Sequence, residues 1–340
     1  MKKPILVAVG CMAALASWGQ ADTPKMNIGG TLRSKYEYQT QEKEGRFEVR
    51  TARVNVSGKL NDAVAYKAEI DLCDEGKIKM LDAWARLAPW RSLQLTMGQM
   101  RVPFTIDAHR SPHQQYFANR SFIAKQVGNV RDVGAMVGYT FHAGFPIVVE
   151  AGMYNGSGLT NQKDFWTNHV NFSAKAQLLL PFGLNVVVSA QKVKPDADDI
   201  MMYDAGLTYH YRGLVAEAEV LYKHYANGAF HPVKAFDGFV SYDIPLRRGR
   251  VKKISPLLRY DYMSEHSDGN RYLDGVADSQ GALVANDAKR GRLTGGMTLS
   301  LDKPFTSDIR LNYEKYFYGH DGVAKPSERD KLVAEFVVKF

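Results

Sequence analysis

The chain from residue 26 onward is dominated by segments in which apolar and polar residues alternate with a period of two. In the first of them, Ile28 and Leu32 share one face while Thr31, Arg33 and Lys35 share the other. Because successive side chains of a strand point to opposite faces, this pattern predicts strands with one apolar and one charged face. Sixteen such segments can be marked, and none has the 3.6-residue period of an amphipathic helix.

The number and polarity of these segments favour a particular fold class. One alternating segment fits a soluble sandwich equally well, but sixteen in succession, with no helices to cover a sheet, favour closure. We therefore predict an all-β fold, a 16-stranded antiparallel transmembrane β-barrel whose strands show every second residue to lipid. A change of phase between Val49 and Ala52 predicts a β-bulge near Thr51.

The connections between the predicted strands alternate in length. The short ones are 61–62, 89–92, 142–145, 181–183, 212–213, 245–249 and 303–306. The longer ones are 40–45, 74–77, 102–131, 155–167, 194–200, 224–232, 264–289 and 319–328. Outer-membrane barrels place short turns in the periplasm and long loops outside. This alternation predicts the same orientation, with both termini on the periplasmic side.

The first residues have the composition of a secretory signal. Two lysines precede an apolar run at 5–16, and the small-x-small sequence Gly19-Gln20-Ala21 follows it. We predict a cleaved signal peptide over residues 1–21 and a single barrel domain over 22–340. The mature chain then holds one cysteine, Cys73, and forms no internal disulfide.

The end of the chain and the aromatic residues indicate a destination. Tyrosine and phenylalanine gather near both ends of the predicted strands, as the two interfaces of a membrane select. The last alternating segment stops at Phe340, which resembles the sorting signal of outer-membrane barrels. We expect a bacterial outer-membrane location, lipid around the barrel, and recognition of Phe340 by the barrel-assembly machinery.

The longest irregular connection carries most of the functional hypothesis. A loop of this length in an ordered protein usually has a function. Residues 102–131 contain four basic residues and one acidic residue, Asp107, a net charge of +3, and His109 and His113 add charge at low pH. We predict that this third external loop folds into the lumen as a basic constriction, because rings of basic side chains select anions.

The candidate anion-binding residues lie in this loop and on the charged faces of nearby strands. They are Arg101, Arg110, Arg120, Lys125, Arg131, Arg33, Lys35, Arg53, Lys67 and Arg86. Acidic residues share the predicted inner faces, so many wall charges are expected to pair across strands. Lys175, Arg259 and Arg310 are also predicted on the wall.

Four stretches carry a resemblance to a known family. They are Met97–Phe104, Asn119–Ser121, Val130–Gly134 and Met153–Gly158, and together they resemble the phosphate-selective porin O and P family. The resemblance implies a homotrimeric sixteen-strand porin in which basic residues pass phosphate or other small anions. A dense ladder of regularly spaced arginines is absent, so phosphate selectivity and general anion preference both stay open.

The sequence leaves two other hypotheses for the function beside an anion-preferring channel. One is a general non-specific diffusion porin, and the other is an outer-membrane barrel enzyme with an active site at its rim. The sequence holds no Gly-x-Ser-x-Gly and no His-Glu-x-x-His, so an enzyme, a cofactor and a metal are not expected. Nucleic-acid binding is not expected either, because the basic residues alternate with apolar ones along strands.

Overall fold

A computed structural model describes ten stretches of the chain. They are residues 25–74, 77–127, 131–156, 158–159, 165–194, 199–228, 230–267, 288–301, 306–319 and 326–340. The predicted signal peptide, residues 1–21, lies outside the described residues, as do residues 128–130 of the predicted constriction loop and most of the connection 264–289.

Antiparallel strands make up nearly all of the described structure. Their bounds are β1 (Lys25–Gln39), β2 (Glu44–Lys59), β3 (Val64–Asp74), β4 (Lys77–Trp90), β5 (Leu93–Arg101), β6 (Arg131–His142), β7 (Pro146–Tyr154), β8 (Asn171–Leu180), β9 (Leu184–Val193), β10 (Ile200–Tyr211), β11 (Leu214–Tyr225), β12 (Val233–Tyr242), β13 (Ile244–Pro245), β14 (Val251–Met263), β15 (Arg290–Leu301), β16 (Thr306–Tyr318) and β17 (Lys331–Lys339). Each pairs with its neighbours in chain order.

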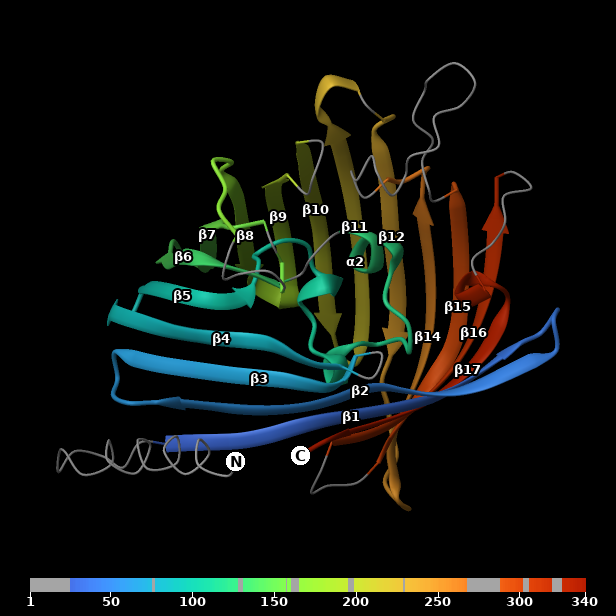
Figure 1. The fold of residues 1–340 in the computed structure, drawn as a ribbon. Helices are drawn as coiled ribbons and strands as arrows, with labels where there is room; N and C mark the ends of the chain where they lie inside the picture. Colours follow the sequence, from blue (N-terminus) through green and yellow to red (C-terminus); the bar gives the residue numbers. More distant parts are fainter. Residues whose placement is uncertain are drawn as a thin grey trace, which may run out of the picture.

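The sheet closes on itself because β1 pairs with both β2 and β17 (Figure 1). The two-residue β13 pairs only with β14, while β12 reaches β14 directly, so sixteen strands form the wall. The predicted fold, a closed 16-stranded antiparallel barrel, is confirmed. Among the described residues, no helix is long and apolar enough to cross a membrane.

The two faces of the wall follow the period-two pattern. On β1, Arg33 and Lys35 are 4% and 6% exposed, whereas their neighbours Leu32 and Tyr36 are 46% and 37% exposed on the outer surface. The strand therefore turns its charged face inward and its apolar face outward, where lipid accommodates it. The predicted bulge is present: Arg33 faces Thr51 and Ser34 faces Val49, so Arg50 is the extra residue.

The chain end completes the closure. The backbone N–H of Phe340 donates to the Gly30 carbonyl at 3.1 Å, and the Gly30 N–H donates to the Phe340 carbonyl at 2.9 Å. A Cβ at Gly30 would lie 2.4 Å from the Phe340 ring, so only glycine leaves room for it. The last residue is thus part of the barrel seam.

The connection between β5 and β6 runs inside the barrel rather than over its rim. Figure 1 shows it as the teal segment within the ring of strands. It contains two 3₁₀ turns, η2 (Asp107–His109) and η3 (Pro112–Gln114), and one helical turn, α2 (Phe122–Gln126). The oxygen of Ser121 accepts the Ala124 N–H at 3.2 Å and caps α2.

Candidate functional site

The infolded loop is attached to one side of the barrel by an apolar cluster. Phe122 and Ile123 are fully buried and pack among inner-wall residues of β10 to β16. These wall partners are Ile200, Met202, Leu221, Tyr225, Val233, Ala235, Met263 and Tyr316. An inner face expected to be polar is therefore apolar where α2 docks. The cluster fills that part of the lumen with packed side chains.

Arginines of the wall hold the loop backbone on the same side. Arg33 donates to the Ala118 carbonyl at 2.7 Å, Arg259 to the Asn119 carbonyl at 3.0 Å and Arg292 to the Arg120 carbonyl at 2.6 Å. Arg310 donates to the carbonyls of Pro112 and His113, both at 3.3 Å. Guanidinium groups thus satisfy carbonyls that no strand or helix engages.

Most of the predicted anion-binding residues are paired with carboxylates. The pairs are Arg33–Glu335 at 2.5 Å, Lys35–Glu37 at 2.8 Å, Arg53–Asp71 at 3.0 Å, Lys67–Asp82 at 2.6 Å, Lys125–Glu328 at 2.8 Å, Arg131–Asp82 at 2.6 Å and Arg110–Glu217. The expected net charge of +3 in the loop is thus largely neutralised by the wall.

The contacts of two loop arginines, Arg110 and Arg120, stabilise the loop itself. Arg110 lies over the Tyr116 ring, 5.1 Å from its centroid, and although burial acts to lower its pKa, the ion pair with Glu217 raises it. Arg120 donates to the carbonyls of Asp107, Ala108 and Arg110 at 2.9–3.2 Å, and burial lowers its pKa to about 10. Both remain charged at neutral pH and organise the loop.

The histidines of the loop differ from expectation. His109 is half-buried, its ring shares a hydrogen bond with the Val102 carbonyl, and desolvation lowers its pKa well below the usual value. His113 has its pKa lowered to about 4, first by burial and then by nearby Lys339 and Arg310. Neither ring gains a proton in mildly acidic solution, so the expected extra charge is absent there.

Of the lysines and arginines that line the lumen cavities, three form no ion pair with a carboxylate in the described part of the chain. Arg86 donates to the Thr96 hydroxyl at 3.0 Å and lies 4.7 Å from the Trp84 ring centroid. Arg101 donates to the His109 carbonyl. Lys175 is 5% exposed and forms no hydrogen bond or ion pair with a described residue, although Glu150 faces it across the β7–β8 ladder. All three line one cavity of about 250 Å³ beside β4 to β8, together with the carboxylate of Glu150.

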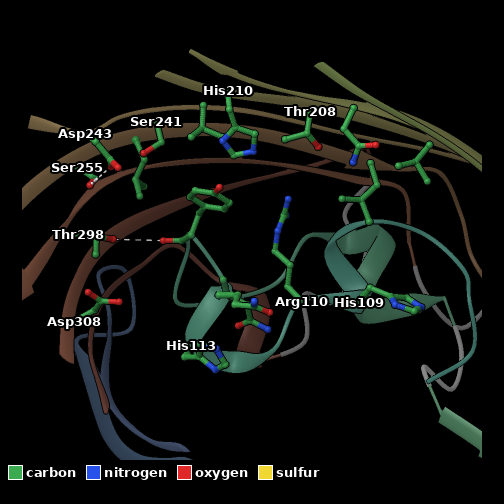
Figure 2. A pocket seen from close by; sticks show the side chains of 18 of the residues that line it. His109, Arg110, His113, Thr208, His210, Ser241, Asp243, Ser255, Thr298 and Asp308 are labelled. Atoms are coloured by element: carbon green, nitrogen blue, oxygen red, sulfur yellow. Dashed lines mark hydrogen bonds between the residues drawn. The ribbon is translucent and has the colours of Figure 1, made fainter. Parts of the chain in front are cut away.

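A larger cavity of about 790 Å³ adjoins it, which we call the vestibule. It lies between the loop and the barrel end with the short connections. Figure 2 shows Arg110 of the loop pointing toward the wall, where Thr208, His210 and Ser241 lie, with His109 and His113 on the loop beside it. His109, Lys175 and Gln177 line both cavities, so the two share part of their walls.

Sequence reasoning identified some residues of this site and missed others. Arg86 and Arg101 were predicted as anion-binding residues, whereas Lys175 was predicted only as a wall residue and Arg292 not at all. Arg292 lies near the start of β15, directly after a long connection, where few alternating residues precede it. It donates to both oxygens of Asp261, at 2.6 and 3.0 Å. No group of three or more described His, Cys, Asp or Glu residues is placed to hold a metal.

A closed barrel with lipid-compatible outer surfaces, a water-accessible interior and an inserted loop defines an outer-membrane channel. The sequence pattern of the family described as phosphate-selective porin O and P matches residues 26–217, more than half of the chain. The chain belongs to this porin family and to the bacterial outer membrane. Its family and fold are those of a channel rather than an enzyme. No curated protein matches the chain.

Solved structures with the same fold are distant in sequence. An anion-selective porin from Comamonas acidovorans is 11% identical with a TM-score of 0.60, covering 93% of this chain and 99% of that one. The outer membrane channel DcaP of Acinetobacter baumannii is 13% identical with a TM-score of 0.60, covering 93% and 97%. OmpF of Salmonella typhi, in complex with daunomycin, is 12% identical with a TM-score of 0.61, covering 93% and 98%.

Proposed function

We propose that the chain forms a water-filled, anion-preferring diffusion channel, with residues 102–131 as its constriction. Permeating solutes are phosphate or other small anions. The observation that carries this proposal is the cluster of Arg86, Arg101 and Lys175. The three side chains line one cavity of the lumen, and none forms an ion pair with a described carboxylate. The other predicted cations position the loop or balance wall carboxylates, so we assign selectivity to these three.

The electrostatic effect of such a cluster is substantial at close range. A unit charge about 5 Å from an ion in a water-like dielectric is worth about 0.8 kcal/mol, a roughly fourfold change in local ion concentration. Salt screens over about 8 Å, which does not hide a charge lining a narrow passage. Two planar guanidinium groups in one cavity also suit an oxyanion, since each binds two oxygens at once.

The test is the reversal potential of the purified protein in planar bilayers under a KCl gradient. We expect anion selectivity in the wild type and a decrease in Arg101→Gln and Lys175→Gln. Arg247→Gln is the control, because it removes the same charge from an exposed position in a short connection. An equal decrease in all three variants, or no anion selectivity in the wild type, would contradict the proposal.

A general non-specific porin is the second candidate. Glu150 in the smaller cavity and Asp308 in the vestibule favour it, since both carboxylates oppose an anion preference. Titration of the chloride current with phosphate separates the possibilities. Block at low phosphate supports a phosphate site, anion preference without block supports a general anion channel, and a potential near zero supports the non-specific porin.

We also propose the topology and partners expected from the sequence. The long connections then lie outside the cell, residues 1–21 are removed on export, Phe340 is recognised by the assembly machinery, and the channel is a homotrimer. One of the similar structures is titled as a trimer form of OmpT of Vibrio cholerae, which supports the last point. Mass measurement of the detergent-purified protein, before and after heating, and amino-terminal sequencing are the tests.

A further inference from the structure

We propose that the vestibule binds organic anions that carry an apolar or aromatic body, with the charged group at Lys175 and the body against an apolar wall. The inference deepens the proposed function and rests on it. It is carried by two adjoining features: the cationic cavity described above and an apolar lining of the vestibule.

The charged end of this site is Lys175. Its side chain lines both cavities, together with His109 and Gln177, so it stands at their junction. His109 is neutral because burial lowers its pKa well below the usual value, and it does not compete for charge. A carboxylate or phosphate group at this junction would lie between Lys175 and the guanidinium groups of the smaller cavity.

The apolar end of this site occupies inner-wall positions where a porin lumen is ordinarily polar. Leu179 lines the vestibule and is 39% exposed, so it carries most of this apolar surface, while Val187 and Leu257 line the cavity behind it and are buried. Val215 and Tyr116 continue the surface over the packed cluster around Phe239. Apolar surface left in contact with water favours a solute that covers it.

The dimensions and remaining charges fit the same class of solute. A cavity of about 790 Å³ lies in the range of small-molecule sites and exceeds what a single inorganic anion fills. The Asp243 carboxylate is engaged by Lys253 at 2.9 Å and by the Ser255 hydroxyl at 2.6 Å (Figure 2). Asp308 lies on β16, across the barrel from Lys175 on β8, whereas Glu150 faces Lys175 across the β7–β8 ladder and is outnumbered there by Lys175, Arg86 and Arg101.

The experiment measures block of the chloride current of the full channel in planar bilayers by benzoate and by acetate. The two anions share a carboxylate and differ in the apolar body. We expect benzoate to block at about tenfold lower concentration than acetate, because the ring adds apolar contact. Leu179→Gln and the isosteric Val215→Thr should raise the half-blocking concentration of benzoate about threefold each and leave that of acetate unchanged.

Lys175→Gln should weaken block by both anions, because it removes the shared charge. Cyclohexanecarboxylate replaces benzoate to separate aromatic from general apolar contact, and block by either supports the class. Equal block by benzoate and acetate in an anion-selective wild type would overturn this inference and leave the proposed function standing. A wild type without anion selectivity would overturn both.

Discussion

The two sides of the lumen use the same residue types for different purposes. On the side of β10 to β17, arginines and carboxylates are paired and donate to or accept from the loop, and α2 is buried in an apolar cluster. On the side of β4 to β8, Arg86, Arg101 and Lys175 line a cavity and form no ion pair, although Arg101 donates to the His109 carbonyl of the loop. The first side holds the infolded loop in place, and the second is the side that we propose acts on solutes.

The comparison shows why the number of basic residues is a poor measure of selectivity. Arg292 is 1% exposed, bound by Asp261 and by a loop carbonyl, and its charge is balanced where it lies. Lys175 forms no ion pair, so its charge is less completely balanced where it lies, although Glu150 faces it across the β7–β8 ladder. Selectivity therefore depends on which cations the fold leaves unpaired.

The largest effect should follow from breaking the packed side at Asp261. This carboxylate is fully buried and accepts from Arg292 and from the Phe122 N–H at 2.9 Å. Asp261→Asn leaves the buried Arg292 with only the longer ion pair to Glu314 at 3.5 Å, and breaking a buried pair costs up to about 3–5 kcal/mol. We expect a lower melting temperature, cleavage of the loop by added protease, and noisier or larger single-channel conductance.

Asp308→Asn is the matched control for Asp261→Asn. The Asp308 side chain lines the vestibule, and no described residue forms an ion pair with it. Loss of its charge should leave the free energy of unfolding within about 0.5 kcal/mol of the wild type and raise anion preference. Equal destabilisation by the two changes would show that the packed side is not the anchor of the loop.

The next largest effect concerns the wall of the open side. On β6, Val137 is 47% exposed on the outer face, while Gly138 faces inward with room for a side chain, since an added Cβ would lie 3.8 Å from Gln94 and Glu150. Val137→Lys places a charge in lipid at a cost of about 2–4 kcal/mol and should prevent assembly, whereas Gly138→Lys should assemble. The yield of heat-modifiable barrel measures both, and the opposite result would mean that the two faces are reversed.

A smaller effect distinguishes unpaired from paired cations. Lys175→Gln should reduce the anion-to-cation permeability ratio about fourfold with little loss of stability. The double change Arg131→Gln with Asp82→Asn removes an ion pair of 2.6 Å but leaves the net charge unchanged. The anion-to-cation permeability ratio should therefore stay at the wild-type value. Reversal potentials at 0.1 M and 1 M salt measure both, and a decrease as large in the double variant would contradict the distinction.

The fold was predictable from the sequence because the alternation of apolar and polar residues within each strand shows which face points to lipid and which to the lumen. Alternation in β1, the bulge at Arg50 and the alternation of short and long connections are all local. The site was only partly predictable, because pairing depends on which strands become neighbours. Arg33 and Glu335 are 302 positions apart and meet only when β1 closes on β17. The apolar docking of Phe122 likewise requires the path of the loop.

The smallest effect concerns His113 on the loop, which faces Lys339 and Arg310. Because its pKa is lowered from 6.5 to about 4, the unfolded chain binds the proton first as pH falls. Its contribution to stability is therefore complete above pH 6.5 and is lost progressively between pH 6.5 and pH 4. Over the same range the ring stays neutral in the folded channel and adds no charge to the vestibule.

His113→Gln isolates this residue from Asp308 and the other carboxylates that titrate near pH 4. We expect the reversal potentials of the variant and the wild type to coincide from pH 8 to pH 5 and to separate only below about pH 4.5, where the wild type gains anion preference. The melting temperature of the variant should depend less on pH between 6.5 and 4. Separation of the reversal potentials already at pH 6 would show that the ring is hydrated and charged, and would move His113 from the packed side of the lumen to the open one.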